Sequence, residues 1–182
     1  IDKVAYTWFN RLVALRFMDA NEYQPIGMSV VSPRTAEHVS PEILNEAHRG
    51  NISPELKVDR TEVMSILNGI KPTNNPDNEV YRILLVAACN HLSKLFPFLF
   101  ERIDDYTELL LPDDLTSPFS IVTDIYKGMS DEDCKEVEII GWLYQFYISE
   151  RKDEVFASKK AVQKEDIPAA TQLFTPRWIV EY

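Results

Sequence analysis

The residues numbered 169–180 carry the clearest chemical signal in this chain of 182 residues. They read Ala-Ala-Thr-Gln-Leu-Phe-Thr-Pro-Arg-Trp-Ile-Val, and Thr175 followed by Pro176 predicts the start of a helix with the threonine as its cap. The first N–H groups of a helix have no partner within it, and the helix dipole makes that end positive. We therefore expect a capped helix start that could hold a carboxylate or a phosphate.

The histidines and cysteines give no pattern typical of a metal site. His91 follows Cys89 by two residues, so the two side chains leave a helix on different faces. Cys89 and Cys134 are too far apart for a CxxC motif, and no carboxylate at a ligand spacing singles out His38 or His48. We predict no metal site and favour a structural role for His91.

Acidic residues offer two further hypotheses. One acidic segment could bind a cation or supply paired carboxylates, but it lacks the DxDxDG order of a calcium loop, and a solvated or protein-contacting surface is the better interpretation. Its members are Glu101, Asp104, Asp105, Glu108, Asp113 and Asp114. Separately, Pro112-Asp113 with Glu150-Arg151-Lys152 matches the PD-(D/E)xK pattern of metal-dependent nucleases, which requires adjacent strands. Because Glu150 and Lys152 end a helical run and diverge there, a nuclease domain is kept only as an alternative.

Two aromatic runs, at residues 6–9 and 142–147, could form stacking platforms for nucleic acid bases. Such platforms are usually interleaved with Lys and Arg, and only Arg11 and Arg16 lie near the first run. We therefore predict that both runs pack in the core. A non-enzymatic module that docks other proteins through its acidic surface is a further alternative.

Composition excludes several classes of protein. The chain is 45% hydrophobic with a net charge of −10, and it has no apolar run long enough to cross a membrane. None of the five glycines belongs to a GxG or GxxxxGK[ST] pattern, so nucleotide hydrolysis is not expected. The negative charge argues against tight DNA binding by this chain alone. We expect a cytoplasmic protein without a signal peptide, and a fragment of a longer chain, since it begins at Ile1 and Tyr182 falls in a new helix.

Helical periodicity dominates the elements that must position these residues. Apolar residues recur at helical spacing from Val4 to Leu15. Further helices are predicted over 61–67 and from Pro76 to about residue 96. A helix start is predicted from Ser130, with acids at 131–133 in its first turn, and the apolar segment 137–148 that follows is predicted to be the central buried helix. A capping residue followed by proline marks helix starts at Ser40-Pro41, Ser53-Pro54, Asn75-Pro76, Ser117-Pro118 and Thr175-Pro176. The sequence predicts an all-α, irregular multi-helix bundle, with room for a short β-hairpin within residues 23–39.

Several of these segments resemble a known family. Gln-Leu-Phe-Thr-Pro at 172–176 resembles the Q-x-[FY]-[FT]-P element that introduces the catalytic domain of N6-adenine DNA methyltransferases and lines their S-adenosylmethionine pocket. The runs at 138–150, 152–156 and 166–170 are similar to the PglX adenine-specific methyltransferases of BREX phage-defence systems. Residues 6–12, 96–101 and 108–112 fit the same family in the same order, and the similarity is weakest over 23–71.

The resemblance implies that the full-length parent transfers a methyl group from S-adenosylmethionine to adenine N6 in double-stranded DNA. It assigns cofactor contacts to Gln172, Phe174, Thr175 and Pro176, with Thr175 meeting the methionine carboxylate. The family's N-P-P-[YF] and F-x-G elements are absent, so we expect no catalytic residue, no tightly bound cofactor and no activity in this chain alone. Other defence-system proteins are candidate partners. The expected divisions are a helical N-terminal domain at 1–150, a charged linker or helix at 151–168, and the start of the catalytic domain at 169–182.

Overall fold

Helices supply all regular secondary structure in the residues that the computed structural model describes, which are 2–35, 40–97, 100, 102–103, 111–136, 138–158, 161–164, 167–171 and 179. In chain order the α-helices are α1 (Asp2–Ala20), α2 (Glu42–His48), α3 (Arg60–Leu67), α4 (Pro76–Leu92), α5 (Ile121–Gly128), α6 (Ile139–Ala157) and α7 (Ile167–Thr171). A short 3₁₀ helix, η2 (Asp133–Lys135), precedes α6. The all-α prediction is confirmed.

The chain folds into two units, residues Ile1–Asp131 and Glu132–Tyr182. The first unit contains α1 to α5, and the second contains η2, α6 and α7. Helix α6 continues without interruption across residue 150 to Ala157. The division predicted at 1–150, 151–168 and 169–182 stays a prediction.

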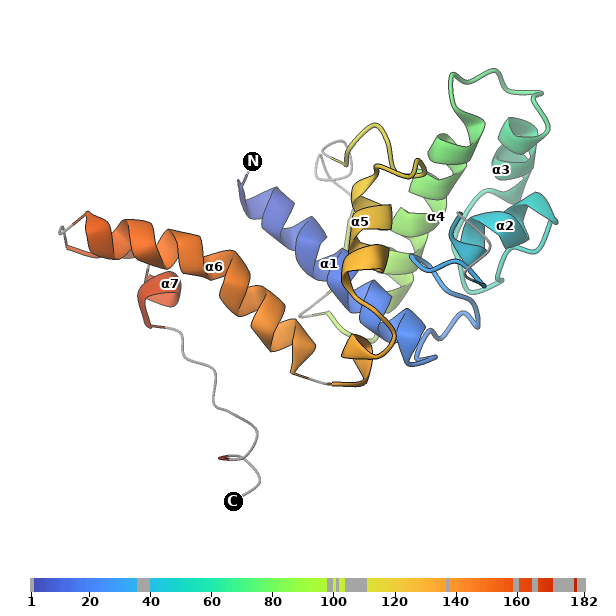
Figure 1. Ribbon diagram of the computed structural model, residues 1–182. Helices are drawn as coiled ribbons and strands as arrows, with labels where there is room; N and C mark the ends of the chain where they lie inside the picture. Colours follow the sequence, from blue (N-terminus) through green and yellow to red (C-terminus); the bar gives the residue numbers. More distant parts are fainter. Residues whose placement is uncertain are drawn as a thin grey trace. The chain divides into compact units, whose positions relative to one another are not determined.

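Helix α4 is the central element of the first unit. Helices α2 and α3 pack against α4, and α1 packs against α5 (Figure 1). The amphipathic pattern predicted for the first helix is confirmed, since Trp8, Leu12 and Leu15 are buried. Buried side chains from α4, including Tyr81 and Leu84, complete the same unit. This core fixes the segments that connect the helices, and those segments carry the polar sites described below.

The predicted helix starts are right at some positions and wrong at others. Asn75 caps α4 as predicted, because its side chain accepts a hydrogen bond from the Asn78 N–H group at 3.1 Å. Ser40 does not cap α2, which begins after Pro41 without a side-chain cap. The pairs at 53–54 and 117–118 form turns instead, and the following helices are capped by Asp59 and Ser120. Thr175-Pro176 lies outside the described residues.

Helix ends also differ from the predictions. Gly50 follows α2 in the left-handed region at φ 80°, a conformation in which glycine commonly ends a helix. Helix α4 ends at Leu92 rather than near residue 96. Residues 93–95 continue only as a turn, in which the Leu95 N–H group donates to the Leu92 carbonyl.

The β-hairpin allowed within 23–39 does not form in the described residues 23–35. The backbone N–H groups of Val30, Val31 and Ser32 all donate to the carboxylate of Asp19, at 3.0, 2.8 and 2.8 Å. The Ser29 N–H group donates to Glu42 Oε2 at 2.8 Å. Since side-chain carboxylates occupy these donors, no strand ladder can use them.

The side chains of two asparagines near opposite ends of α4 form hydrogen bonds with the backbone of irregular segments that lie beside the helix. The Asn78 side chain accepts from the Leu115 N–H group at 2.7 Å and donates to the Asp113 carbonyl. The Asn90 side chain accepts from the Ile103 N–H group at 2.7 Å and donates to the Ile103 carbonyl at 3.0 Å. Each amide thus satisfies a donor and an acceptor of an irregular segment.

The prediction of a central buried helix over 137–148 is wrong for the side chains that can be described. In α6, Ile140 and Trp142 are exposed by 39% and 47%, and Phe156 further along the helix by 58%. The helix start predicted from Ser130 does not form, because α6 begins only at Ile139, and of the acids at 131–133 Asp133 begins η2. None of the described helices combines the length and the apolar character that a membrane span requires.

Candidate functional site

The residues predicted to contact the cofactor, Gln172, Phe174, Thr175 and Pro176, lie outside the described residues. The last described helix before them is α7, which ends at Thr171. Their assignment to S-adenosylmethionine therefore stays a prediction from sequence.

The histidines and cysteines do not assemble a reactive centre in the described part of the chain. His48 Nε2 lies 2.9 Å from Asp77 Oδ1, joining α2 to α4, and both side chains are about half exposed. His38 lies outside the described residues. Cys89 is fully buried, and burial raises the pKa of its thiol to about 12. No cluster of three or more His, Cys, Asp or Glu side chains that could hold a metal occurs among the described residues.

The acidic segment is described only in part, since Glu101, Asp104, Asp105 and Glu108 lie outside the described residues. Asp114 has a local structural role. It accepts hydrogen bonds from the Ser117 N–H group at 3.0 Å and the Thr116 N–H group at 3.3 Å. The hydrogen bond from the Ser117 side chain, followed by those two backbone bonds, lowers the pKa of Asp114. A turn preceding α5 is thereby fixed.

The nuclease pattern lacks its required scaffold. Residues 150–152 lie within α6, and residues 112–113 lie in an irregular segment. The chemistry of that motif requires the acids and the lysine on neighbouring strands, and the described residues contain no strand. The backbone observed here therefore does not favour the nuclease alternative.

The two aromatic runs have different surroundings. Trp8 is buried in the core, and the guanidinium carbon of Arg11 lies 5.1 Å from the centre of its ring. Core packing is confirmed for that residue. Trp142 is largely exposed, so the prediction that the second run packs in the core is wrong at this position.

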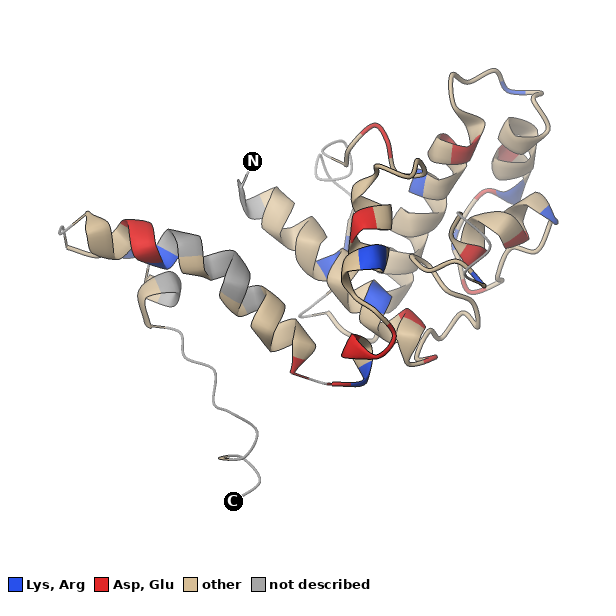
Figure 2. Ribbon diagram, viewed as in Figure 1, with Lys and Arg blue, Asp and Glu red and all other residues tan. Residues whose placement is uncertain are grey.

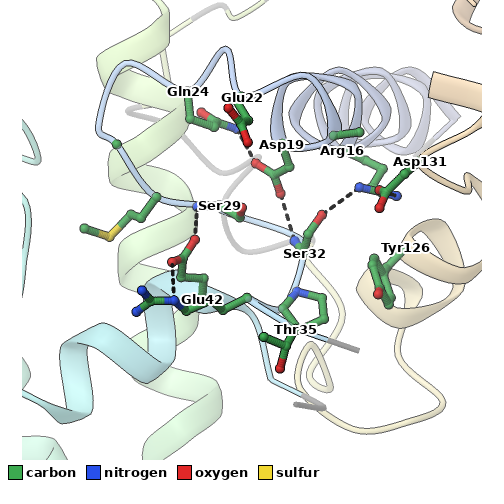
Figure 3. A pocket seen from close by; sticks show the side chains of 15 residues that line it. Arg16, Asp19, Glu22, Gln24, Ser29, Ser32, Thr35, Glu42, Tyr126 and Asp131 are labelled. Carbon is green, nitrogen blue, oxygen red and sulfur yellow. Dashed lines mark hydrogen bonds and ion pairs between the residues drawn. The ribbon is translucent and has the colours of Figure 1, made fainter. Parts of the chain in front are cut away.

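A polar pocket of about 570 Å³ lies within the first unit, between the end of α1, the connector at 24–35 and α5. Figure 3 shows Arg16, Asp19, Ser32, Tyr126 and Asp131 around it. Sequence reasoning did not identify this pocket. The available signal was the pair Arg16 and Asp19, two charges three residues apart on a helix whose neighbouring positions are apolar.

Arg16 forms one wall of the polar pocket, although its side chain is only 2% exposed. Its Nε donates to the Met129 carbonyl at 2.9 Å, and its terminal nitrogens reach Ser32 Oγ at 3.0 Å and Asp131 Oδ1 at 2.5 Å. The guanidinium carbon also lies 5.1 Å from the centre of the Tyr126 ring. A buried charge requires such compensation, so Arg16 joins α1 to the connector and to the segment after α5.

Asp19 is the matching buried anion, with 8% of the residue exposed. Besides the three backbone donors of the connector, it accepts from Gln24 Nε2 at 2.6 Å. Burial raises the pKa of its carboxyl group, while the hydrogen bonds from the connector and from Gln24 oppose that rise. Both buried charges of the polar pocket are thus engaged by the fold, and they supply no free acid or base.

In sequence, the chain is similar to adenine-specific methyltransferases over its whole length. It is 46% identical over 189 aligned positions to adenine-specific methyltransferase BrxX of Escherichia coli O9:H4 (strain HS). It is 41% identical over 189 positions to adenine-specific methyltransferase PglX of Lacticaseibacillus casei (strain Zhang). The chain spans 14% and 15% of the lengths of these two proteins. No family model matches it. The resemblance inferred from the sequence motifs is therefore confirmed.

Proposed function

We propose that this chain is the helical N-terminal part of an adenine-N6 DNA methyltransferase that acts in phage defence, of the BREX or restriction-modification type. The observation that carries the proposal is the identity of 46% and 41% to two adenine-specific methyltransferases along all of this chain. In this role the first unit is a scaffold for the catalytic part of the parent, in the cytoplasm, and the chain alone is inactive. Other proteins of the same defence system are its candidate partners.

The parent would use S-adenosylmethionine, which supplies the methyl group, and double-stranded DNA, from which the target adenine must leave the base stack. Within this chain, the cofactor contacts would come from Gln172, Phe174, Thr175 and Pro176. Thr175 and the first N–H groups of the helix that follows would bind the carboxylate of the methionine moiety, because a helix start offers unpaired donors and a positive dipole end.

Methyl transfer by the full-length parent tests the proposed activity. The parent, incubated with S-adenosylmethionine and double-stranded DNA, should produce N6-methyladenine that mass spectrometry detects after digestion. Residues 1–182 alone should produce none. Unmodified DNA after incubation with correctly folded parent would contradict the proposal.

The cofactor assignment has its own test in the same parent. Thr175→Ala should weaken S-adenosylmethionine binding in calorimetry by about tenfold or more, because a tenfold loss is about 1.4 kcal/mol and one hydrogen bond to a charged group contributes about 1.5–3 kcal/mol. Thr171→Ala is the matched control, because the Thr171 hydroxyl donates to the Ile167 carbonyl within α7 at 2.7 Å. Equal affinity of both variants would remove Thr175 from the site.

A further inference from the structure

A second pocket, of about 290 Å³, lies in the first unit beside the C-terminal end of α4. We call it the basic pocket. Its lining contains three cations and one acid, together with a histidine and three smaller residues: Lys57, Lys94, Arg102, Glu55, His91, Ala87, Asn90 and Ser93. A local excess of positive charge is unusual in a chain whose net charge is −10.

The position of each cation in the basic pocket is determined by a neighbouring part of the chain that the fold holds in place. Lys57 comes directly after Leu56, which is buried, and Arg102 directly before Ile103, which is buried and bound on both sides by Asn90. Lys94 lies in the turn that continues α4, where its N–H group donates to the His91 carbonyl at 3.3 Å. Residues 55–57 are thus brought together with lining residues from the distant range 87–102 by backbone that the core holds in place.

The lysines of the basic pocket make no ion pair with a described residue, unlike several other cations of the first unit. Lys71 is paired with Glu62 at 2.7 Å, and Arg49 with Glu46 at 2.6 Å. Figure 2 shows acidic and basic residues interspersed along the helices of this unit, an arrangement that favours such pairing. Lys57 and Lys94, by contrast, are exposed and have only Glu55 as an acidic neighbour in the pocket lining.

His91, which lines the basic pocket, has a ring nitrogen without a partner in the part of the chain that the structure describes. Its Nδ1 is buried and has no hydrogen-bond partner among the described residues. A buried polar atom without a partner needs an explanation, and a bound water or ion is one such explanation. His91 also lies in the last turn of α4, although the negative end of the helix dipole there is neutralised in part by the surrounding cations.

We propose that the basic pocket binds a phosphate of the DNA backbone. The proposal rests on the proposed function, which makes double-stranded DNA the substrate of the parent. Lysine ammonium groups on flexible stems can bind a backbone phosphate as point charges, with less demand on geometry than a bidentate arginine. Since the rest of the chain is acidic and repels DNA, a contact by the first unit must be concentrated at a local basic site.

The test measures DNA binding by the full-length parent as a function of salt. Each phosphate neutralised contributes about 0.9 to the slope of log affinity against log salt. Lys57→Gln and Lys94→Gln should each lower affinity for a DNA duplex about three- to tenfold, independently of duplex sequence. Because the pocket binds one phosphate, the double variant should reduce that slope by about 0.9 in total. Because Arg102 is flanked in sequence by Glu101 and Asp104, the two lysines are the residues to test.

Lys127→Gln provides the matched control, since Lys127 is an exposed lysine of α5 that does not line the basic pocket. It should change affinity by less than about twofold, as expected for an exposed charge outside the contact that is screened by salt. Glu55→Gln should raise affinity about two- to threefold, because it removes the one acid of the lining. A folding defect would lower affinity rather than raise it. The Glu55 variant therefore shows whether the losses in the lysine variants come from a lost contact or from a damaged fold.

The outcomes distinguish this proposal from the proposed function. If the wild-type parent methylates DNA but the Lys57→Gln/Lys94→Gln variant keeps the wild-type salt slope, the basic pocket does not contact DNA. If inorganic phosphate shifts the NMR signals of His91 while the slope stays unchanged, the pocket takes a free anion, and the DNA contact is overturned. If the wild-type parent neither binds nor methylates DNA, the proposed function itself fails.

Discussion

Replacing Asp19 by asparagine tests what fixes the connector of the first unit. The Asp19 Oδ2 atom accepts from the N–H groups of Val31 and Ser32, each at 2.8 Å. Oδ1 accepts from Val30 and from Gln24. An asparagine of the same shape keeps one acceptor oxygen and places an NH₂ group where the other stood. Two donors then lose their acceptor, the N–H groups of Val31 and Ser32 if Oδ2 is replaced, or the Val30 N–H group and the Gln24 side chain if Oδ1 is replaced.

The magnitude follows from these contacts. A buried donor left without an acceptor costs about 1–3 kcal/mol, so two of them cost about 4 kcal/mol. Burying the charged carboxylate also costs free energy, and this is the effect that raises the pKa of Asp19. The neutral amide avoids that cost, and we take this gain to offset about half of the loss from the unpaired donors. Asp19→Asn should therefore lower the free energy of unfolding by about 2 kcal/mol.

Urea denaturation followed by circular dichroism measures this loss. The control is Asp59→Asn, because Asp59 caps α3 by accepting from Thr61 and Glu62, and asparagine is an equally good cap. The control should stay within about 0.5 kcal/mol of the unmodified chain. An equally small change for Asp19→Asn would show that the connector is fixed by other contacts.

Two smaller predictions concern ionisable groups. Cys89 and Cys134 are both buried, and burial raises the pKa of Cys89 to about 12. At pH 8 neither thiol should therefore react with a disulfide reagent until the chain is unfolded in guanidinium. Rapid labelling of Cys89 in the native chain would contradict its burial. The lowered pKa of Asp114 means that its stabilising contribution is present above the ordinary value of 3.8 and is lost as pH falls through the native pKa. An NMR titration should place its midpoint below 3.8, and Ser117→Ala should move it upward; a midpoint unaffected by that substitution would argue against the turn.

The local part of the fold could be predicted from sequence, because short-range patterns determine it. The apolar spacing from Val4 to Leu15 identifies α1, and Asn75 before Pro76 identifies the start of α4. The same type of pattern was misleading at Ser53 and Ser117. There the serine hydroxyl accepts from the N–H group two residues on, at 3.4 and 3.1 Å, which closes a turn. A capped turn continues as a helix only when the following residues present an apolar face that packs against the rest of the protein.

The pockets could not be predicted, because they depend on contacts between residues far apart in sequence. Asp19 reaches residues 11 to 13 positions away, and Arg16 reaches Asp131 across 115 positions. The basic pocket likewise joins Lys57 to Lys94 and Arg102, which lie in a distant part of the sequence. Nothing in the immediate sequence around any of these residues specifies its partners.

The asparagines of α4 carry a consequence for how related sequences can vary. Asn78 and Asn90 recognise only main-chain groups, at Leu115 and Asp113 in one case and at Ile103 in the other. Main-chain groups are the same for almost every amino acid, so the amides tolerate substitution of the residues they bind. Among homologous proteins, both asparagines of α4 should therefore be retained. The residues they bind should vary in type, limited only by the packing of the core.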